Sequence, residues 1–591
     1  MAPMGRGASN VTARVAASQG ALNAVTPQFQ RALDVPYGGV LLALPALLAL
    51  GLLEGNEASL NKLPSGYYGL DSLLMLLAFM ALGRLETIES LRYYAPGEWG
   101  KLLGLDRVPE VRTLRAKIQI LCADGQAQKW SAELSQRWMQ ADPEQAGVLY
   151  VDGHTRVYHG SQTLLPRHYV ARQKLCLRAT VDFWVNAMDG QPFFAVNKVA
   201  DPGLIKVIEE DILPRLEQDV PNQPTQLSLD ADPFLHRFTV VFDREGYSPN
   251  LLSRLKDKRV ACLSYHKFPG EDWALHEFAE HRMTLVSGQV VTAQLAERGT
   301  RMSNGLWVRE LRKLSQRGHQ TSIITTDYRS EVSRVAVNML ARWSQENYFK
   351  YAREHYSLDR LAGYCTEEIA DPIEVVNPVY RALDGQVRSA NGKLSRTMAL
   401  FGALSIEQTI EPPHVEAFTA KKAALKDQID TLQSDIARLK DTRKATARHI
   451  EVKDLPEDQR FAQLSTHSKH FVDTIKMVSY RAETAMANFL RESLTRADEA
   501  RTLVRALYTT EADLVPDLQR KTLTVRVHHL AQHRSDQAIA KLCDELNQTQ
   551  TVFPRTDLRM IFQLGTLQQP PRMEDAECES RSIQNPRDQV V

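Results

Sequence analysis

The sequence has almost no net charge and few cysteines. Its 72 lysines and arginines balance 71 acidic residues, leaving a net charge of +1. A nucleic-acid partner would therefore have to meet a local basic patch, because the molecule as a whole is not basic. The six cysteines include no C-x2-C pair, which argues against a zinc site or a disulfide framework and fits a reducing cytoplasm.

Apolar runs long enough to cross a membrane are also lacking. The charge-free stretch 35–53 barely reaches the roughly 20 residues that a spanning helix needs. Pro36, Pro45 and the paired glycines 38–39 interrupt it, and no basic cluster flanks it. It also begins behind a polar leader, unlike a signal peptide. We expect a buried core helix here, no membrane contact and a cytoplasmic location.

The length of the chain, 591 residues, is too great for one ordinary core. Residues 1–30 are rich in alanine, serine and glycine, and we expect a flexible leader. The pattern over 31–140 is helical and ends in a basic amphipathic helix, 111–120, after a proline-led turn. This helix suits DNA binding of the helix-turn-helix sort; the alternative is an ordinary helical domain with a basic exposed face.

Near residue 147 the pattern changes from helices to strands. An Asp189-Gly190 turn marks a hairpin, and helical segments separate the later strands. A three-stranded meander followed by alternating helices and strands describes the ribonuclease-H-like order. We expect such an α/β core, a mixed sheet flanked by helices, over 145–410. The expected strands are 148–151, 156–159, 175–187, 193–196, 238–243 and 259–265.

The segment 266–326 is too long for an unstructured loop, and its β-like pieces predict a β-rich insertion. Residues 411–565 predict a helical C-terminal region. Its coiled-coil seam spans only about two heptads, so we expect an intramolecular hairpin rather than a long dimer rod. The polar tail, 566–591, is expected to be disordered. The seam residues are Leu425, Ile429, Leu432, Ile436 and Leu439.

Three carboxylates carry the predicted chemistry. Asp152 and Asp243 each end a strand-like run, and Glu346 lies in a helix-like run. Hard divalent cations prefer carboxylate oxygens, and two such ions can activate an attacking oxygen and stabilise a leaving one, which suits phosphodiester chemistry. Arg342 and Arg353 share the helix face of Glu346 and could hold phosphate oxygens.

The spacing Arg342-x3-Glu346-x6-Arg353 resembles the Tyr-x2-Arg-x3-Glu-x6-Lys signature of DDE transposases from bacterial insertion sequences. Asp152-Gly-His-Thr and Asp243-Arg-Glu-Gly-Tyr-Ser look like the two aspartate motifs of that group. Met339 stands where the signature has tyrosine, and Arg353 replaces its lysine. The resemblance covers roughly 100–410, including the β insertion.

The resemblance implies cleavage at transposon ends and transfer of the freed 3′ hydroxyl into target DNA, without a covalent protein–DNA intermediate. It implies that Asp152, Asp243 and Glu346 bind Mg2+ or Mn2+, two ions per site. Double-stranded DNA and a homodimer or higher synaptic assembly are the implied partners. The implied location is the bacterial cytoplasm, at the nucleoid when DNA is bound.

Several residues have competing interpretations. Glu245, on the strand face of Asp243, and Asp327, after the strand that ends the insertion, are alternative third carboxylates. His276 and His281 are five apart, so on a helix they diverge and do not form a zinc protease motif. A basic run could follow the DNA backbone or be a solvated surface. Its members are Arg298, Arg301, Arg309, Arg312, Lys313 and Arg317.

Two other functions remain open. One is a DNA-binding or scaffold protein that derives from a transposase and has lost activity. The other is a metal-dependent nuclease that cleaves without joining strands. The aromatic residues beside Glu346 are also ambiguous, because they could stack on DNA bases or pack in the core. We expect Tyr348 and Phe349 to be core, and Trp343 is left open.

Overall fold

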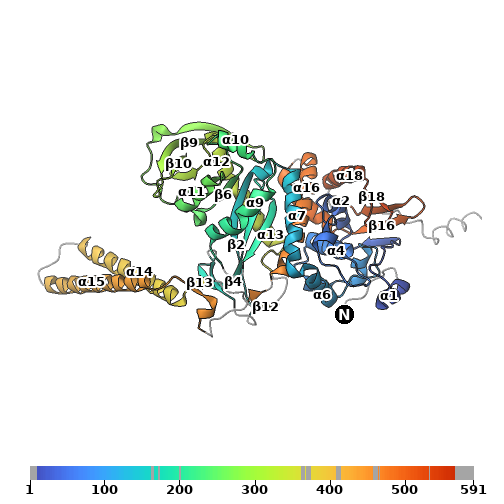
Figure 1. Cartoon of the computed structure of the whole chain (residues 1–591), viewed down its shortest axis with the longest axis horizontal. Helices are drawn as coiled ribbons and strands as arrows, with labels where there is room; N and C mark the ends of the chain where they lie inside the picture. The colour runs from blue at the N-terminus through green and yellow to red at the C-terminus, as the bar shows by residue number, and fades with distance from the viewer. Residues whose placement is uncertain are drawn as a thin grey trace, which may run out of the picture.

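The computed structural model describes residues 10–160, 165–170, 173–198, 201–360, 366–367, 374–406, 414–456, 463–464, 466–494, 496–530 and 533–565. It shows a mixed α/β protein with a central sheet, a largely helical unit beside it, and a long helical hairpin that projects away from both (Figure 1). None of the helices in the described ranges is long and apolar enough to cross a membrane. The predicted tail 566–591 lies outside the described residues.

Ten strands of the described chain form the central sheet, in the order β3-β4-β2-β6-β7-β11-β10-β9-β8, with β5 paired to β4. β2, β4 and β5 form an antiparallel meander, whereas β2, β6 and β7 are parallel. The first strands are β2 (Val148–Val157), β3 (Arg167–Val170), β4 (Leu175–Asn186), β5 (Pro192–Lys198), β6 (Thr239–Phe242) and β7 (Ala261–Tyr265).

Helical crossovers explain the parallel pairs, because parallel strands need a long connection. A helical segment joins β5 to β6 and α11 joins β6 to β7. Every residue of β6 is buried, as expected for a strand covered on both faces. The connecting helices are α8 (Leu204–Val207), a π turn (Ile208–Ile212), α9 (Leu213–Asp219), α10 (Gln226–Ala231) and α11 (Pro249–Asp257).

The β-rich insertion continues the central sheet. β11 pairs with β7, and β10, β9 and β8 follow as an antiparallel series, so the insertion extends this sheet instead of forming a separate one. Two helices, α12 and α13, come next. The bounds are β8 (Ala279–Thr284), β9 (Val290–Arg301), β10 (Trp307–Leu314), β11 (Gln320–Thr325), α12 (Val332–Leu340) and α13 (Arg342–His355).

The apolar, charge-free stretch 35–53 is largely buried in the helical unit, where it forms a short 3-10 helix and α2. Its paired glycines pack closely on the C-terminal part of the chain: a Cβ on Gly39 would lie 1.8 Å from the carbonyl oxygen of Leu507. The other helices here are α3 (Asn56–Ser59), α4 (Leu70–Leu82), α5 (Pro96–Lys101), α6 (Val111–Cys122) and α7 (Gln126–Ala141), after the 3-10 helix Gly38–Ala43 and α2 (Leu44–Ala49).

The C-terminal part of the chain completes the same unit. Its long helix α16 (His467–Ser493) contacts α4, α6 and α7 and is buried along much of its length. Helices α17 (Ala500–Thr509) and α18 (His533–Gln548) follow. Residues distant in sequence therefore share one core.

The region 411–565, which was expected to be helical, contains strands as well as helices. Three strands there join an N-terminal strand in a second sheet, in the order β1-β16-β17-β18. The signal was present, because leucine and valine alternate with polar residues along β17 and the apolar ones are buried. The strands are β1 (Ala32–Val35), β16 (Ala512–Asp517), β17 (Thr522–Val527) and β18 (Arg559–Leu564).

The leader is also more ordered than its composition predicts. Residues 1–9 lie outside the described chain, but α1 (Val11–Ser18) follows, and Val25 and Phe29 are buried in the core. Phe29 packs edge-on against Phe553, with ring centroids 4.7 Å apart. Two buried apolar side chains fix a segment whose small residues alone would leave it loose.

The hairpin that projects in Figure 1 consists of α14 (Pro378–Ile406) and α15 (Val415–Ala445), which pack against each other. We call it the α14–α15 hairpin. Ile429 and Ile436 of the predicted seam are buried at 6% and 5% exposure, although most of the surface of these helices is exposed. The prediction of an intramolecular hairpin is confirmed.

Candidate active site

Asp152 and Asp243 lie side by side on two neighbouring parallel segments. The register pairs Val151 of β2 with Phe242, the last residue of β6, so the two aspartates are the next residue along each segment. Asp152 does not end its strand as predicted, because β2 continues to Val157 in its pairing with β4. It marks instead the point where the parallel pairing with β6 stops.

The sheet face that bears Asp152 is turned towards α12 and α13. Side chains two apart along a strand point the same way. Tyr150 donates its hydroxyl hydrogen to the carbonyl of Asn338 in α12, and the His154 ring stacks on Phe349 of α13 at 5.1 Å. Asp152 lies between these two residues on the same face. Its carboxylate therefore faces the helix that carries Glu346.

Arg342, the first residue of α13, joins the three carboxylates. Its Nη1 atom lies 3.9 Å from Oδ2 of Asp152 and 3.9 Å from Oδ2 of Asp243. Its Nη2 atom donates to Oε1 of Glu346, one turn along the same helix. The helix-like run predicted from Met339 is divided at Ala341, which is why the guanidinium is at a helix start facing both strands.

The carboxylates repel one another. Burial is the main reason that the pKa of Asp152 rises to about 6; Arg342 opposes the rise, whereas Asp243 and Glu346 add to it. Burial would lower the pKa of Arg342, but Asp243, Asp152 and Glu346 outweigh it and raise the pKa. The site therefore concentrates negative charge, and the guanidinium is its counter-charge.

Glu245 belongs to the same acidic surface. Its pKa rises to about 7, first because of burial and then because of the negative charges of Asp201, Asp152 and Asp243. The other alternative, Asp327, serves a different purpose. It is buried, and its Oδ1 atom accepts backbone N–H hydrogen bonds from Arg329 and Ser330, both at 3.0 Å, which stabilise the turn after β11.

Buried contacts fix α13 next to its carboxylate. Gln345 donates through Nε2 to the carbonyl oxygen of Tyr150 at 3.0 Å and to Oδ1 of Asn186 at 3.0 Å. Gly190, in the predicted hairpin turn, has φ +89°, and a Cβ there would lie 2.5 Å from the carbonyl oxygen of Ser344. The helix thus contacts β2, β4 and the β4–β5 turn through the two residues that precede Glu346.

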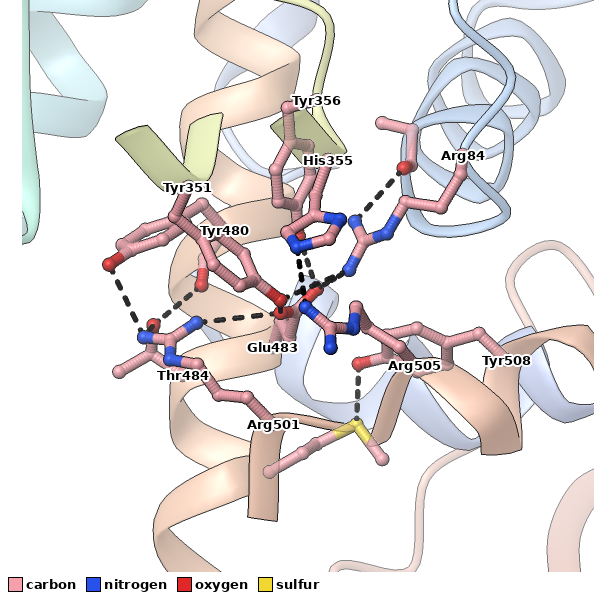
Figure 2. A network of polar contacts seen from close by, with 12 residues as sticks. Arg84, Tyr351, His355, Tyr356, Tyr480, Glu483, Thr484, Arg501, Arg505 and Tyr508 are labelled. Atoms are coloured by element: carbon pink, nitrogen blue, oxygen red, sulfur yellow. Dashed lines mark hydrogen bonds and ion pairs between the residues drawn. The ribbon is translucent and has the colours of Figure 1, made fainter. Parts of the chain in front are cut away.

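The far end of α13 is held by a buried carboxylate on α16. Figure 2 shows Glu483 among three arginines, Arg84, Arg501 and Arg505, and tyrosines that include two from the end of the α13 segment. Arg84 pairs with Glu483, and the Tyr356 hydroxyl donates to it at 2.7 Å. Tyr351 also donates to it, and Arg501 lies 3.4 Å away. No spacing in the sequence identifies Glu483 or Gln345, because their partners are distant in sequence.

A family model described as a transposase protein matches residues 5–566. The chain belongs to this transposase family. Comparison with curated proteins finds no match. Among solved structures, the synaptic complex of the piggyBac transposase with hairpin DNA is similar over 73% of this chain and 74% of that one. The sequence identity is 9% and the TM-score 0.27, values too low to establish a shared fold.

Two residues of the proposed signature lie apart from the carboxylates of this transposase. Met339 is buried in α12, where it packs with the core beneath β2. Arg353 lies about 16 Å from Arg342 along the helix axis, since each residue adds about 1.5 Å. Its Nε donates to the carbonyl oxygen of Phe349 at 3.3 Å. Arg342 and Arg353 are therefore about three helical turns apart.

The aromatic side chains of α13 divide as expected. Tyr348 and Phe349 are buried at 3% and 7% exposure, which confirms them as core. Trp343 is 61% exposed beside Arg342, so its ring is open to solvent at the edge of the site.

The basic run of the insertion is only partly available to DNA. Arg312 is buried and pairs with Glu310, and Arg309 pairs with Glu297 and donates to the carbonyl oxygen of Asp327 at 2.7 Å. Arg298 pairs with Glu277, so the acidic residue between His276 and His281 forms an ion pair. We therefore leave Arg309 and Arg312 out of the DNA surface. Arg301 and Arg317 are exposed, and Lys313 is half-buried.

Another group of potential metal ligands lies in the second sheet. Asp34, Asp513 and His528 place one ligand atom each within 4.8 Å of one another. Hydrogen bonds account for this cluster: the Asp34 N–H donates to Asp513 at 3.1 Å, and Nε2 of His528 lies 3.2 Å from the same carboxylate oxygen. We assign it a structural role in joining β1 to β16 and β17.

Proposed function

We propose that this transposase cleaves DNA at the ends of its element in a metal-dependent reaction and joins the freed 3′ hydroxyl to target DNA. The observation that carries the proposal is the convergence of Asp152, Asp243 and Glu346 on Arg342. Family membership supports transposition, and the carboxylates supply chemistry suited to a phosphodiester.

The donor set fits a hard divalent cation. Asp152, Asp243 and Glu346 offer only oxygen atoms, and burial together with mutual repulsion raises the pKa of Asp152, so added positive charge would be stabilised there. These three residues would hold Mg2+ or Mn2+, two ions in our proposal, with Glu245 as a further acid nearby. Bound metal would supply Lewis-acid stabilisation of charge at phosphorus.

The chain's own residues position the substrate in this proposal. Arg342 keeps the carboxylates together before DNA arrives and can then turn a guanidinium edge towards a phosphate oxygen. Gln345 holds α13 against β2, so the relative position of Glu346 and Asp152 is set by the fold. The exposed Trp343 lies where a base next to the cleaved phosphate could stack.

The strand order supports a ribonuclease-H-like core. β2, β4 and β5 form a meander, and the parallel strands β6 and β7 follow with helical crossovers; the expected strands 148–151 and 156–159 fall largely in the single strand β2. The spacing of Arg342, Glu346 and Arg353 likewise supports the DDE type of bacterial insertion sequences. We propose double-stranded DNA as the partner and a dimer or larger assembly, because cutting and joining two ends requires two sites.

The test is an incubation of the protein with Mg2+ or Mn2+ and DNA that bears the element's ends. We expect nicks with 3′ hydroxyls and then joined products. Asp152→Asn and Asp243→Asn should each lower cleavage by about a thousandfold or more, since several kcal/mol of charge stabilisation are lost. The matched control is Asp257→Asn, an exposed aspartate at the end of α11.

Three results would contradict the proposal. Cleavage by Asp152→Asn at the wild-type rate would show that the site is elsewhere. Cleavage without joining would favour a nuclease. DNA binding with no cleavage in either metal would favour a scaffold protein derived from a transposase.

A further inference from the structure

The helical unit contains a cavity of about 610 Å3, at some distance in sequence from the carboxylates. It lies where α1 and the N-terminus of α6 meet the 3-10 helix Ile88–Tyr93 and the segment that joins α5 to α6. Its volume is within the range of small-ligand sites, about 300–1,000 Å3.

One wall of the cavity contains an arginine that is held by several contacts. The Arg14 guanidinium donates two hydrogen bonds to Asp106, both at 2.5 Å, and a third to the Tyr68 hydroxyl at 3.1 Å. It also lies over the Tyr67 ring, 3.9 Å from the centroid. Tyr68 in turn donates to the carbonyl oxygen of Arg107 at 3.1 Å. These contacts order the wall before any ligand binds.

The rim of the cavity carries two exposed arginines, Arg92 and Arg112. Arg92 has a side chain that is 61% exposed and forms an ion pair with Glu89 at 2.9 Å. Arg112, in the first turn of α6, is exposed and makes no ion pair within the described residues. Arginines outnumber acids on the lining, where Glu110 is the acidic residue. An anion would meet two guanidinium groups here.

Aromatic rings lie beside these arginines. Tyr94 lines the cavity and is held edge-on by Tyr37, at 5.7 Å, and by Trp99, at 5.9 Å. Tyr93, the next residue in the chain, is 84% exposed. Aromatic faces and guanidinium planes both stack on nucleic-acid bases without regard to sequence.

We propose that this cavity binds a single unpaired nucleotide of a DNA strand, its phosphate against Arg92 and Arg112 and its base against the tyrosines. The proposal rests on the proposed function, because DNA is the substrate there. A phosphate-bearing peptide would meet the same arginines but would leave the ordered tyrosines unused. The combination of arginine pairs with aromatic faces therefore favours DNA.

The experiment measures binding without metal, in EDTA, so it does not depend on cleavage. Fluorescence anisotropy compares a blunt duplex with one that ends in a single-stranded overhang containing 2-aminopurine. We expect tighter binding of the overhang and quenching of the 2-aminopurine as it stacks. The double variant Arg92→Ala/Arg112→Ala should bind the overhang about tenfold or more weakly, with a smaller salt dependence.

The matched control is Arg438→Ala/Arg520→Ala, which removes two exposed arginines at side-chain exposures of 77% and 84%. It should leave the preference for the overhang and the quenching unchanged. Tyr94→Leu tests the aromatic face separately and should lose quenching more than affinity. Thermal unfolding verifies that each variant is folded.

Two outcomes would overturn the proposal. Unchanged overhang binding and quenching in the Arg92→Ala/Arg112→Ala variant would remove the cavity as a DNA site. If the Arg92→Ala/Arg112→Ala variant lost affinity for a phosphopeptide but kept its affinity for DNA, the ligand of the cavity would be a protein. Competition with free deoxyadenosine monophosphate distinguishes a nucleotide in a strand from a free one: weaker binding of the free nucleotide than of the overhang supports the proposal. Failure of the cleavage assay in the preceding section would leave these results unaffected.

Discussion

Arg342 lies at equal distance from Asp152 and Asp243: Nη1 is 3.9 Å from an Oδ2 atom of each. One guanidinium therefore balances two carboxylates on neighbouring strands, and it also pairs with Glu346. A divalent cation bound by these oxygens would carry charge of the same sign as Arg342 in the same place. Arginine and metal should therefore compete electrostatically.

This competition predicts opposite effects on metal binding and on catalysis. Arg342→Ala should bind Mn2+ more tightly, by about tenfold, because a nearby positive charge is removed. It should also cleave DNA more slowly, since the guanidinium can no longer hold a phosphate. Titration with Mn2+, followed by the cleavage assay, measures both quantities.

Arg353→Ala is the matched control, because Arg353 is on the same helix and contacts Phe349 instead of the carboxylates. Its Mn2+ affinity should equal that of the wild type. Weaker metal binding by Arg342→Ala would show that the arginine supports the metal site and does not compete with it.

The raised pKa values predict how pH acts on the site. Asp152 and Glu245 have pKa values of about 6 and about 7, chiefly because of burial. Without metal, the folded state binds more protons than the unfolded chain, so stability should fall as pH rises from the ordinary carboxyl range through these values. Mg2+ requires the ionised form, so its affinity should rise over the same interval.

Unfolding curves at several pH values, with and without Mg2+, measure this effect. Glu245→Gln removes one negative charge and should move the pH dependence of Mg2+ binding towards lower pH. A pH dependence that is identical in wild type and Glu245→Gln would mean that Glu245 does not interact with the metal site.

The candidate carboxylates could be proposed from the sequence because the signals that mark them are local. Asp152 and Asp243 follow apolar runs that form β2 and β6, and Glu346 is one turn from Arg342 on an amphipathic helix. The role of Arg342 could not be foreseen, because it depends on where α13 begins relative to two distant strands. The division of the helix at Ala341 decides that position.

Other features escaped prediction for the same physical reason. Arg309 and Arg312 belong to a basic run that the sequence alone suggests is exposed to solvent. In the structure both are buried in the sheet, where Glu297 and Glu310 pair with them. The strands β16–β18 are only six residues each and alternate with the helices α17 and α18, so a helical pattern dominates the surrounding sequence. Local periodicity predicts elements, whereas pairing across the fold decides which polar residues are exposed.

Gln345 provides a test of how the fold positions Glu346. Its amide donates to two buried acceptors on β2 and β4. Gln345→Leu should lower the free energy of unfolding by about 1–3 kcal/mol, because these acceptors lose a partner. It should also slow cleavage, since α13 is no longer fixed to the strand that bears Asp152. Urea unfolding and the cleavage assay measure the two effects.

Asn347→Leu is the matched control, an exposed amide on the same helix. It should change neither stability nor cleavage appreciably. If Gln345→Leu loses stability but cleaves at the wild-type rate, the hydrogen bonds stabilise the fold without positioning Glu346.

Glu483 predicts a pH dependence of the opposite sign. Burial alone would raise its pKa, but Arg84, the Tyr351 hydroxyl and Arg501 outweigh burial and hold the pKa below its usual range. A carboxyl with a depressed pKa stabilises the folded state above its unfolded pKa, and this contribution is lost as pH falls through the folded value.

Glu483→Gln should therefore lower the free energy of unfolding by about 3–5 kcal/mol near neutral pH, because it leaves buried arginines without their partner. The cost should shrink in acid, where the wild-type carboxyl is protonated too. Unfolding by urea across this pH range, with the exposed Glu492→Gln on the same helix as control, measures the difference; a cost that is independent of pH would mean that shape and packing, not charge, make Glu483 necessary.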